Sequence, residues 1–226
     1  MRGNTPQLIF SATNALNKWL KADLPRLPVE PGKQAGVNTL SSGSDCLCWQ
    51  VHIIDNRYQS YEKTIIACEA NSRFTFFLPV EQRLSLQELT QILQMEWQAV
   101  LADTLEAYQI IPRSEIALLL SDLSELEFNP EWVRNTDLSI NGHISDAGLW
   151  VTDTLSDRKL SQLTPELAAE LAAYLNTQTR RIKQRKVKFV PLERLLGYCR
   201  DLSGKVREEE ALHSAKIIKL SDYRRT

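Results

Sequence analysis

Apolar residues recur at alternating and at helical spacing along the chain, and the two patterns predict its elements. Three alternating or apolar stretches, residues 46–55, 61–70 and 74–80, are separated by short polar turns. This arrangement is typical of an antiparallel three-stranded meander. Residues 7–10 predict a further short strand, followed by a helix that ends near residue 22.

A long amphipathic helix is predicted directly after the meander. Ser85 and Glu88 match the Ser-x-x-Glu capping box at the start of many helices. From Leu86 to Leu105 the apolar residues recur every three or four positions, so we expect one face of this helix to cover the sheet. Residues 23–45, rich in Pro, Gly and Ser, predict a long surface loop.

The rest of the chain predicts shorter elements. Residues 114–121 and about 142–155 favour helices, and residues 125–128 favour a short strand. Further helices are predicted to begin at Thr164, as a cap, and at Pro191.

We therefore expect an α+β fold, in which an antiparallel sheet (the three-stranded meander plus short strands) is covered by helices. The predicted α+β domain spans residues 1–157. A basic helical extension follows at residues 158–212, and a C-terminal tail at residues 213–226.

Composition narrows the class of protein. With 226 residues, 43% hydrophobic and 24% charged, the chain is neither disordered nor collagen-like, and it is too long for a disulfide miniprotein. Its apolar runs are far shorter than the ~20 residues of a membrane span. The first residues lack the apolar segment of a signal peptide, so we expect a cytoplasmic protein that does not enter membranes.

The net charge of −1 conceals two halves of opposite sign. Residues 1–154 hold 11 basic and 19 acidic residues, whereas residues 155–226 hold 16 basic and 9 acidic residues. Such asymmetry indicates an acidic body with a basic appendage. The basic part can meet nucleic acid, an acidic partner protein or the acidic body itself.

Four cysteines raise the question of a metal site. Cys46 and Cys48 share one side of a predicted strand with His52, and Cys68 can lie on the neighbouring strand. Structural zinc sites usually use a C-x₂₋₄-C turn instead, and free cysteine often packs as a small hydrophobic residue. The chain also lacks the common nucleotide-binding and hydrolase motifs. We expect no metal, no cofactor and no disulfide.

Residues 134–146 form the best candidate for a polar cleft. His143 can act as a general base with Asp146 as its orienting partner, because residues three apart on a helix share a face. Ser139 is a further weak catalytic candidate. Helix capping and solvent exposure explain the same residues without catalysis.

The basic segment 180–188 is the candidate nucleic-acid surface, and its cations can follow phosphates either as a helix or as an extended strand. The residues concerned are Arg180, Arg181, Lys183, Arg185, Lys186 and Lys188. In the tail, the apolar Ile218, Leu220 and Tyr223 are candidates for binding a partner or the parent domain.

Four segments carry a resemblance that covers about residues 7–155. They are Phe10-Ser-Ala-Thr-Asn-Ala-Leu16, Asp45-Cys-Leu-Cys-Trp49, Arg73-Phe-Thr-Phe-Phe-Leu-Pro-Val80 and residues 135–146. The chain resembles an uncharacterised bacterial family known only as a domain of unknown function. The resemblance implies the fold and a shared polar segment, and it implies no chemistry.

Taken together, these features favour a non-enzymatic bacterial accessory or regulatory protein that acts by macromolecular contact. The basic segment 180–188 is its predicted nucleic-acid surface. Two alternatives remain open: an enzyme that uses His143 and Asp146 in a cleft at 134–146, or a protein-interaction module that uses the C-terminal tail.

Overall fold

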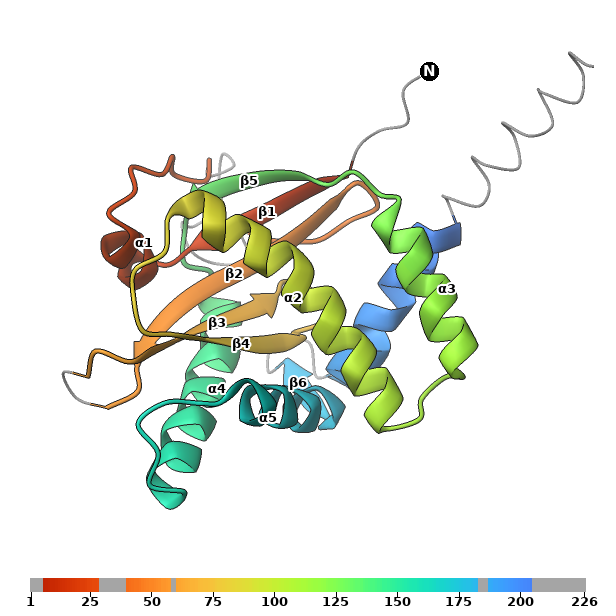
Figure 1. The fold of residues 1–226 in the computed structure, drawn as a ribbon. Coiled ribbons are helices and arrows are strands. Elements are labelled where there is room, and N and C mark those ends of the chain that lie inside the picture. The colour runs from red at the N-terminus through yellow and green to blue at the C-terminus, as the bar shows by residue number, and fades with distance from the viewer. Residues whose placement is uncertain (1–5, 29–39, 58–59, 183–186, 205–226) are drawn as a thin grey trace, which may run out of the picture.

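A five-stranded sheet lies at the centre of the computed structural model, which describes residues 6–28, 40–57, 60–182 and 187–204 (Figure 1). The strand order is β4-β3-β2-β1-β5. The strands are β1 (Gln7–Ala12), β2 (Cys46–Asp55), β3 (Lys63–Glu69), β4 (Thr75–Val80) and β5 (Asn129–Arg134).

The sheet is mixed, which corrects the prediction of an antiparallel sheet. The meander β2-β3-β4 is antiparallel as predicted. However, β1 runs parallel to both β2 and β5, with Phe10 level with Trp49 on one side and Trp132 on the other. The strand predicted at 125–128 is also wrong, because β5 begins at Asn129. Parallel pairing joins segments far apart in the chain, and no short-range pattern reports it.

Helices cover both faces of the sheet (Figure 1). α2 (Leu86–Ala107) packs on one face, where the Trp97 ring lies 6.1 Å from that of Trp49 in β2. α4 (Leu138–Asp157) packs on the other face, with Gly148 against Ile54 and Ile66. Two covered faces explain why β2 and β3 are buried along nearly their whole length.

The predicted helix starts are mostly confirmed. Thr13 caps α1 (Asn14–Leu20), the Ser85–Glu88 capping box opens α2, and Thr164 caps α5 (Pro165–Thr177). α3 (Arg113–Ser124) follows Pro112. α4 starts earlier than predicted, because Asp137 caps it, and the Asn141-Gly142 pair lies inside the helix.

Residues 165–177 and 191–204 form helices on either side of a hairpin. α5 and a helix over residues 191–204 flank β6 (Arg180–Ile182) and β7 (Val187–Phe189), which pair antiparallel. Leu171, Leu195 and Leu202 belong to the same buried cluster as the sheet, so the core continues past residue 157. Among the described residues, no helix is both long and apolar enough to cross a membrane.

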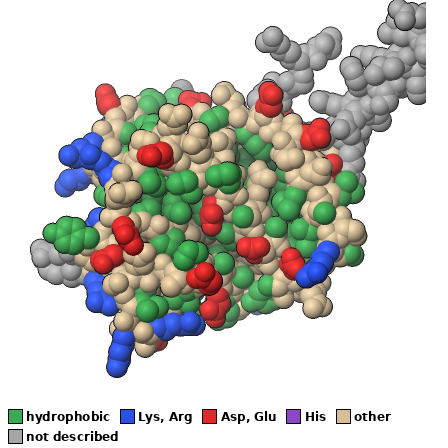
Figure 2. Space-filling view, viewed as in Figure 1, with side chains coloured by type: hydrophobic (Ala, Val, Ile, Leu, Met, Phe, Trp, Pro, Cys, Tyr) green, Lys and Arg blue, Asp and Glu red, His purple; other side chains and the backbone are tan. Residues whose placement is uncertain are grey.

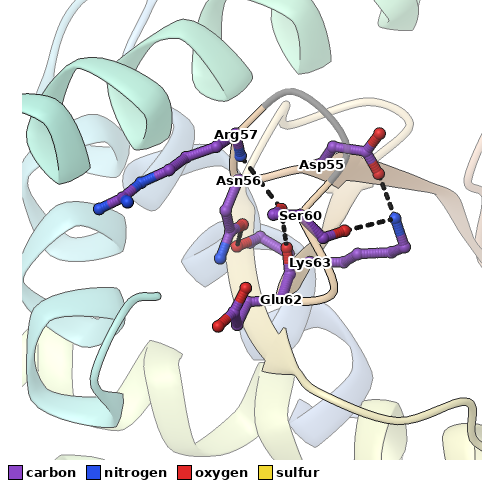
Figure 3. Close-up of polar contacts among 7 residues, drawn as sticks. Asp55, Asn56, Arg57, Ser60, Glu62 and Lys63 are labelled. Atoms are coloured by element: carbon purple, nitrogen blue, oxygen red, sulfur yellow. Dashed lines mark hydrogen bonds and ion pairs between the residues drawn. The ribbon is translucent and has the colours of Figure 1, made fainter. Parts of the chain in front are cut away.

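The β2–β3 turn holds the connection between α4 and α5 in place. Asn56 is 3% exposed; its Oδ1 accepts from the Thr64 hydroxyl at 2.7 Å, and its Nδ2 donates to the Ser161 carbonyl at 3.2 Å. Exposed Arg57 donates to the Leu160 carbonyl at 2.6 Å. Figure 3 shows this turn, with Lys63 reaching back to Asp55.

We expect Asn56→Ala to lower the free energy of unfolding by about 1–3 kcal/mol, because it leaves the buried Thr64 hydroxyl and the Ser161 carbonyl without their partner. Urea denaturation followed by tryptophan fluorescence measures the change. Arg57→Ala, which removes an exposed bond to the same connection, is the matched control, with an expected loss within about 0.5 kcal/mol. Equal losses in the two variants would contradict the assignment to buried hydrogen bonds.

Candidate functional site

A polar cleft of about 770 Å³ lies where the β3–β4 turn, the start of α4 and the helix over residues 191–204 meet. Its inner wall includes Glu69, Arg73 and Ser139, whereas the exposed Glu193 and Asp201 belong to its outer part. Segments far apart in the sequence thus place charged side chains of both signs around one cavity.

Glu69, at the end of β3, organises the turn that forms one wall of the cleft. Its side chain is 2% exposed, and both of its carboxylate oxygens accept hydrogen bonds. Oε1 accepts from the Ser42 hydroxyl, and Oε2 accepts from the backbone N–H of Asn71 at 3.0 Å and from the N–H and hydroxyl of Ser72. Because its acceptors are engaged within the protein, Glu69 acts as a structural anchor of the cleft.

Arg73 ends this turn in an unusual state. Its backbone φ is +63°, a left-handed conformation that costs a non-glycine residue roughly 1 kcal/mol. The side chain is 7% exposed, and its Nη2 donates to the Ser139 hydroxyl at 3.2 Å. The buried Nε and Nη1 have no hydrogen-bond acceptor among the described residues. A buried guanidinium with two unpartnered donors is costly, so stability alone does not account for this residue.

The start of α4 meets this guanidinium. Asp137 is fully buried and accepts from the backbone N–H of Ser139 at 2.8 Å and of Leu40 at 3.1 Å. The Ser139 hydroxyl donates to Asp137 at 2.6 Å while it accepts from Arg73. A chain of hydrogen bonds therefore connects the Arg73 guanidinium to a buried carboxylate through one hydroxyl.

The three catalytic candidates in the segment 134–146 occupy different surroundings. Ser139 lines the cleft, but His143 and Asp146 are not among its described lining residues. His143 is half-buried; burial, together with the positive charges of Arg73 and Arg180, lowers the pKa of its imidazole to about 4. No hydrogen bond joins His143 to the exposed Asp146 in the described part of the chain. A catalytic pair of His143 and Asp146 stays a prediction.

The described residues of the basic segment form the paired strands β6 and β7. Of the two predicted conformations, helix and extended strand, these residues adopt the extended strand. Arg181 of β6 and Lys188 of β7 lie directly opposite each other, and both are exposed. Arg180 is half-buried and lies close enough to His143 and Cys68 to affect their pKa values. Several of the predicted binding residues lie outside the described residues. They are Lys183, Arg185 and Lys186 of the basic segment, and Ile218, Leu220 and Tyr223 of the tail.

The cysteines are free thiols in the sheet and the final helix. Cys46 and Cys48 share one side of β2 as predicted, with sulfur atoms 3.3 Å apart. His52 instead lies 2.8 Å from the Thr13 hydroxyl through its Nδ1. Within the described ranges, no three side chains of the metal-binding types gather around a common point.

Glu69 and Arg73 are the functional candidates that sequence reasoning missed. Arg73 lies in a predicted turn, where charged residues are ordinary, and Glu69 lies next to the end of the predicted strand 61–70. The one local signal is the absence of Gly or Asn at residue 73, the turn position that adopts the left-handed conformation. Burial of the two side chains depends on α4 and the final helix, so it has no signature in the turn sequence.

If Arg73 is retained at a cost to stability, removing it will not destabilise the fold. We expect Arg73→Asn to leave the free energy of unfolding unchanged or to raise it by up to about 1 kcal/mol, because Asn accepts the left-handed conformation and two unpartnered donors disappear. Glu69→Gln in the same turn is the contrast, with an expected loss of about 2 kcal/mol or more. Chemical denaturation checks both values, and a clear loss in Arg73→Asn would show that the guanidinium supports folding.

The lowered pKa of His143 predicts a loss of stability in acid. Its pKa is about 4 in the folded protein and about 6.5 when unfolded, so between these values the unfolded chain binds more protons. The free energy of unfolding therefore falls as the pH drops from 6.5 towards 4. We expect His143→Gln to reduce this fall by on the order of 1 kcal/mol between pH 7 and pH 5. Denaturation of both proteins at the two pH values measures the difference, and parallel curves would refute it.

The chain matches no protein-family model, no curated protein and no solved structure. The resemblance to an uncharacterised bacterial family therefore stays a prediction.

Proposed function

We propose that the chain is a non-enzymatic binding protein that contacts the phosphate backbone of nucleic acid through the β6–β7 hairpin. The observation that supports this proposal is the placement of Arg181 and Lys188, exposed and directly opposite each other in the ladder. Like charges directly opposite each other in a sheet repel. An anionic partner that binds both side chains offsets this repulsion, because each cation then lies next to a negative charge.

The charges around the pair support a partner from outside the molecule. Within residues 6–28, 40–57, 60–182 and 187–204, no acidic side chain forms an ion pair with Arg181 or Lys188. Acidic side chains are scattered over the face on which α2 and α3 lie (Figure 2). Docking of the hairpin on the protein's own acidic surface is therefore the less favoured explanation of its charge.

A two-stranded ribbon also suits the shape of nucleic acid. The major groove of duplex DNA admits an α-helix or a two-stranded β-ribbon, and the phosphates on either side attract cations along both strands of such a ribbon. The hairpin carries basic residues on both strands. We assign it backbone contact without base readout, because Arg and Lys side chains alone do not define a sequence preference here.

The test is a salt titration of binding to labelled duplex DNA, single-stranded DNA and RNA, with the full-length chain. We expect the affinity to fall steeply with salt. The double variant Arg181→Glu/Lys188→Glu is expected to bind at least tenfold more weakly, with a log–log salt slope shallower by about 2 for duplex DNA.

Lys18→Glu/Arg83→Glu is the matched control, since both residues are exposed, lie far from the hairpin in sequence and give the same change in net charge. It is expected to keep both affinity and slope. Equal weakening in the two double variants would mean that only net charge matters. Absence of binding at low salt would reject the nucleic-acid proposal and turn attention to an acidic protein partner.

A further inference from the structure

We propose that the cleft beside Arg73 is a binding site for a small zwitterionic molecule of the amino-acid type, whose carboxylate pairs with the Arg73 guanidinium. The site is separate from the hairpin contact and does not rest on it. Its size of about 770 Å³ is in the range of small-molecule sites.

The inner end of the cleft is built for a carboxylate. The side chain of Arg73 is more than nine-tenths buried, and its Nε and Nη1 find no acceptor among the described residues. A planar guanidinium pairs with a carboxylate through two parallel hydrogen bonds. The head of Arg73 is held by one hydrogen bond to Ser139. Nε and Nη1 are enclosed by protein atoms, so the ligand's carboxylate pairs with the guanidinium only after this bond opens and the head turns toward the cavity.

The outer part of the cleft points to a positive charge on the same ligand. Glu193 and Asp201 lie on the exposed side of the final helix, and no ion pair involves either of them among the described residues. Arg194, the other cation of the lining, already donates to the Asn71 carbonyl at 3.2 Å and stacks on Phe189. Two free carboxylates repel a multiply charged phosphate and attract an amino group.

Glu69 does not compete for Arg73 as an internal partner. Its two oxygens are occupied by donors from Ser42, Asn71 and Ser72, and no ion pair joins it to Arg73 in the described ranges. Asp137 is linked to the guanidinium through the Ser139 hydroxyl, and no ion pair joins Asp137 to Arg73 among the described residues. Among the described residues, the Arg73 guanidinium therefore has no carboxylate in direct contact. A carboxylate of a bound ligand would supply this missing counter-charge.

The experiment is a thermal-shift screen of the full-length chain against the twenty L-amino acids, acetate and inorganic phosphate, followed by calorimetry of the hits. Ligands that bind only the folded state raise the melting temperature with concentration. We expect at least one amino acid to do so, and to bind at least tenfold more tightly than acetate. Phosphate is expected to give no shift.

Two variants locate the site. Arg73→Lys keeps the charge but loses the two-pronged donor, so we expect at least tenfold weaker binding of the amino acid. The double variant Glu193→Gln/Asp201→Asn changes only exposed side chains. We expect it to lower the affinity for the amino acid at least fivefold and to leave the affinity for acetate unchanged.

Three outcomes would overturn the proposal. The first is a screen without any amino-acid shift. The second is an amino acid whose affinity is the same in both variants, which would place its site elsewhere. The third is phosphate binding that depends on Arg73 and exceeds that of every amino acid, which would make the ligand a phosphate instead.

Discussion

The buried carboxylate of Asp137 joins three parts of the chain that are distant in sequence. Burying a carboxylate costs several kcal/mol unless donors surround it. Asp137 meets this demand with the backbone of Leu40, ahead of β2, and with the backbone and hydroxyl of Ser139 in α4. Its own N–H donates to Gln50 in the middle of β2 at 2.6 Å. The first turn of α4 is thereby fixed against the sheet, and this fixes the position at which Ser139 meets Arg73.

The parts of the fold that follow from local chemistry could be predicted from the sequence. The meander and the capped starts of α2 and α5 depend on residues only a few positions apart, such as Ser85 and Glu88. The parallel pairing of β1 with β2 and β5 could not, because it joins Phe10 to Trp132 across more than half of the chain. The prediction places the start of α4 too late for a similar reason. Asp137 is one of several possible caps in its segment, and only its contacts with Leu40 and Gln50 select it.

Some residues of the candidate site could likewise be predicted from the sequence, and others could not. Ser139 was recognisable as a polar residue in a polar segment, and it does line the cleft. Arg73 and Glu69 were not, since a charged residue in a turn or at the end of a strand is ordinary until other elements bury it. The basic segment was compatible with a helix and with an extended strand. Pairing of Arg180 with Phe189 settles it as a hairpin, with Phe189 buried beneath the guanidinium of Arg194, and this contact again comes from a later part of the chain.

Arg194 belongs to the surroundings of both proposed surfaces. Its guanidinium carbon lies 3.7 Å from the centre of the Phe189 ring in β7, and its Nη1 donates to the carbonyl of Asn71 in the turn that ends at Arg73. One side chain therefore connects the hairpin to a wall of the cleft. Linkage requires that a ligand which changes the energy of this connection at one surface changes affinity at the other by the same factor. The two proposed sites recognise different chemistry, and if both bind their ligands, Arg194 is the contact through which binding at one would affect binding at the other.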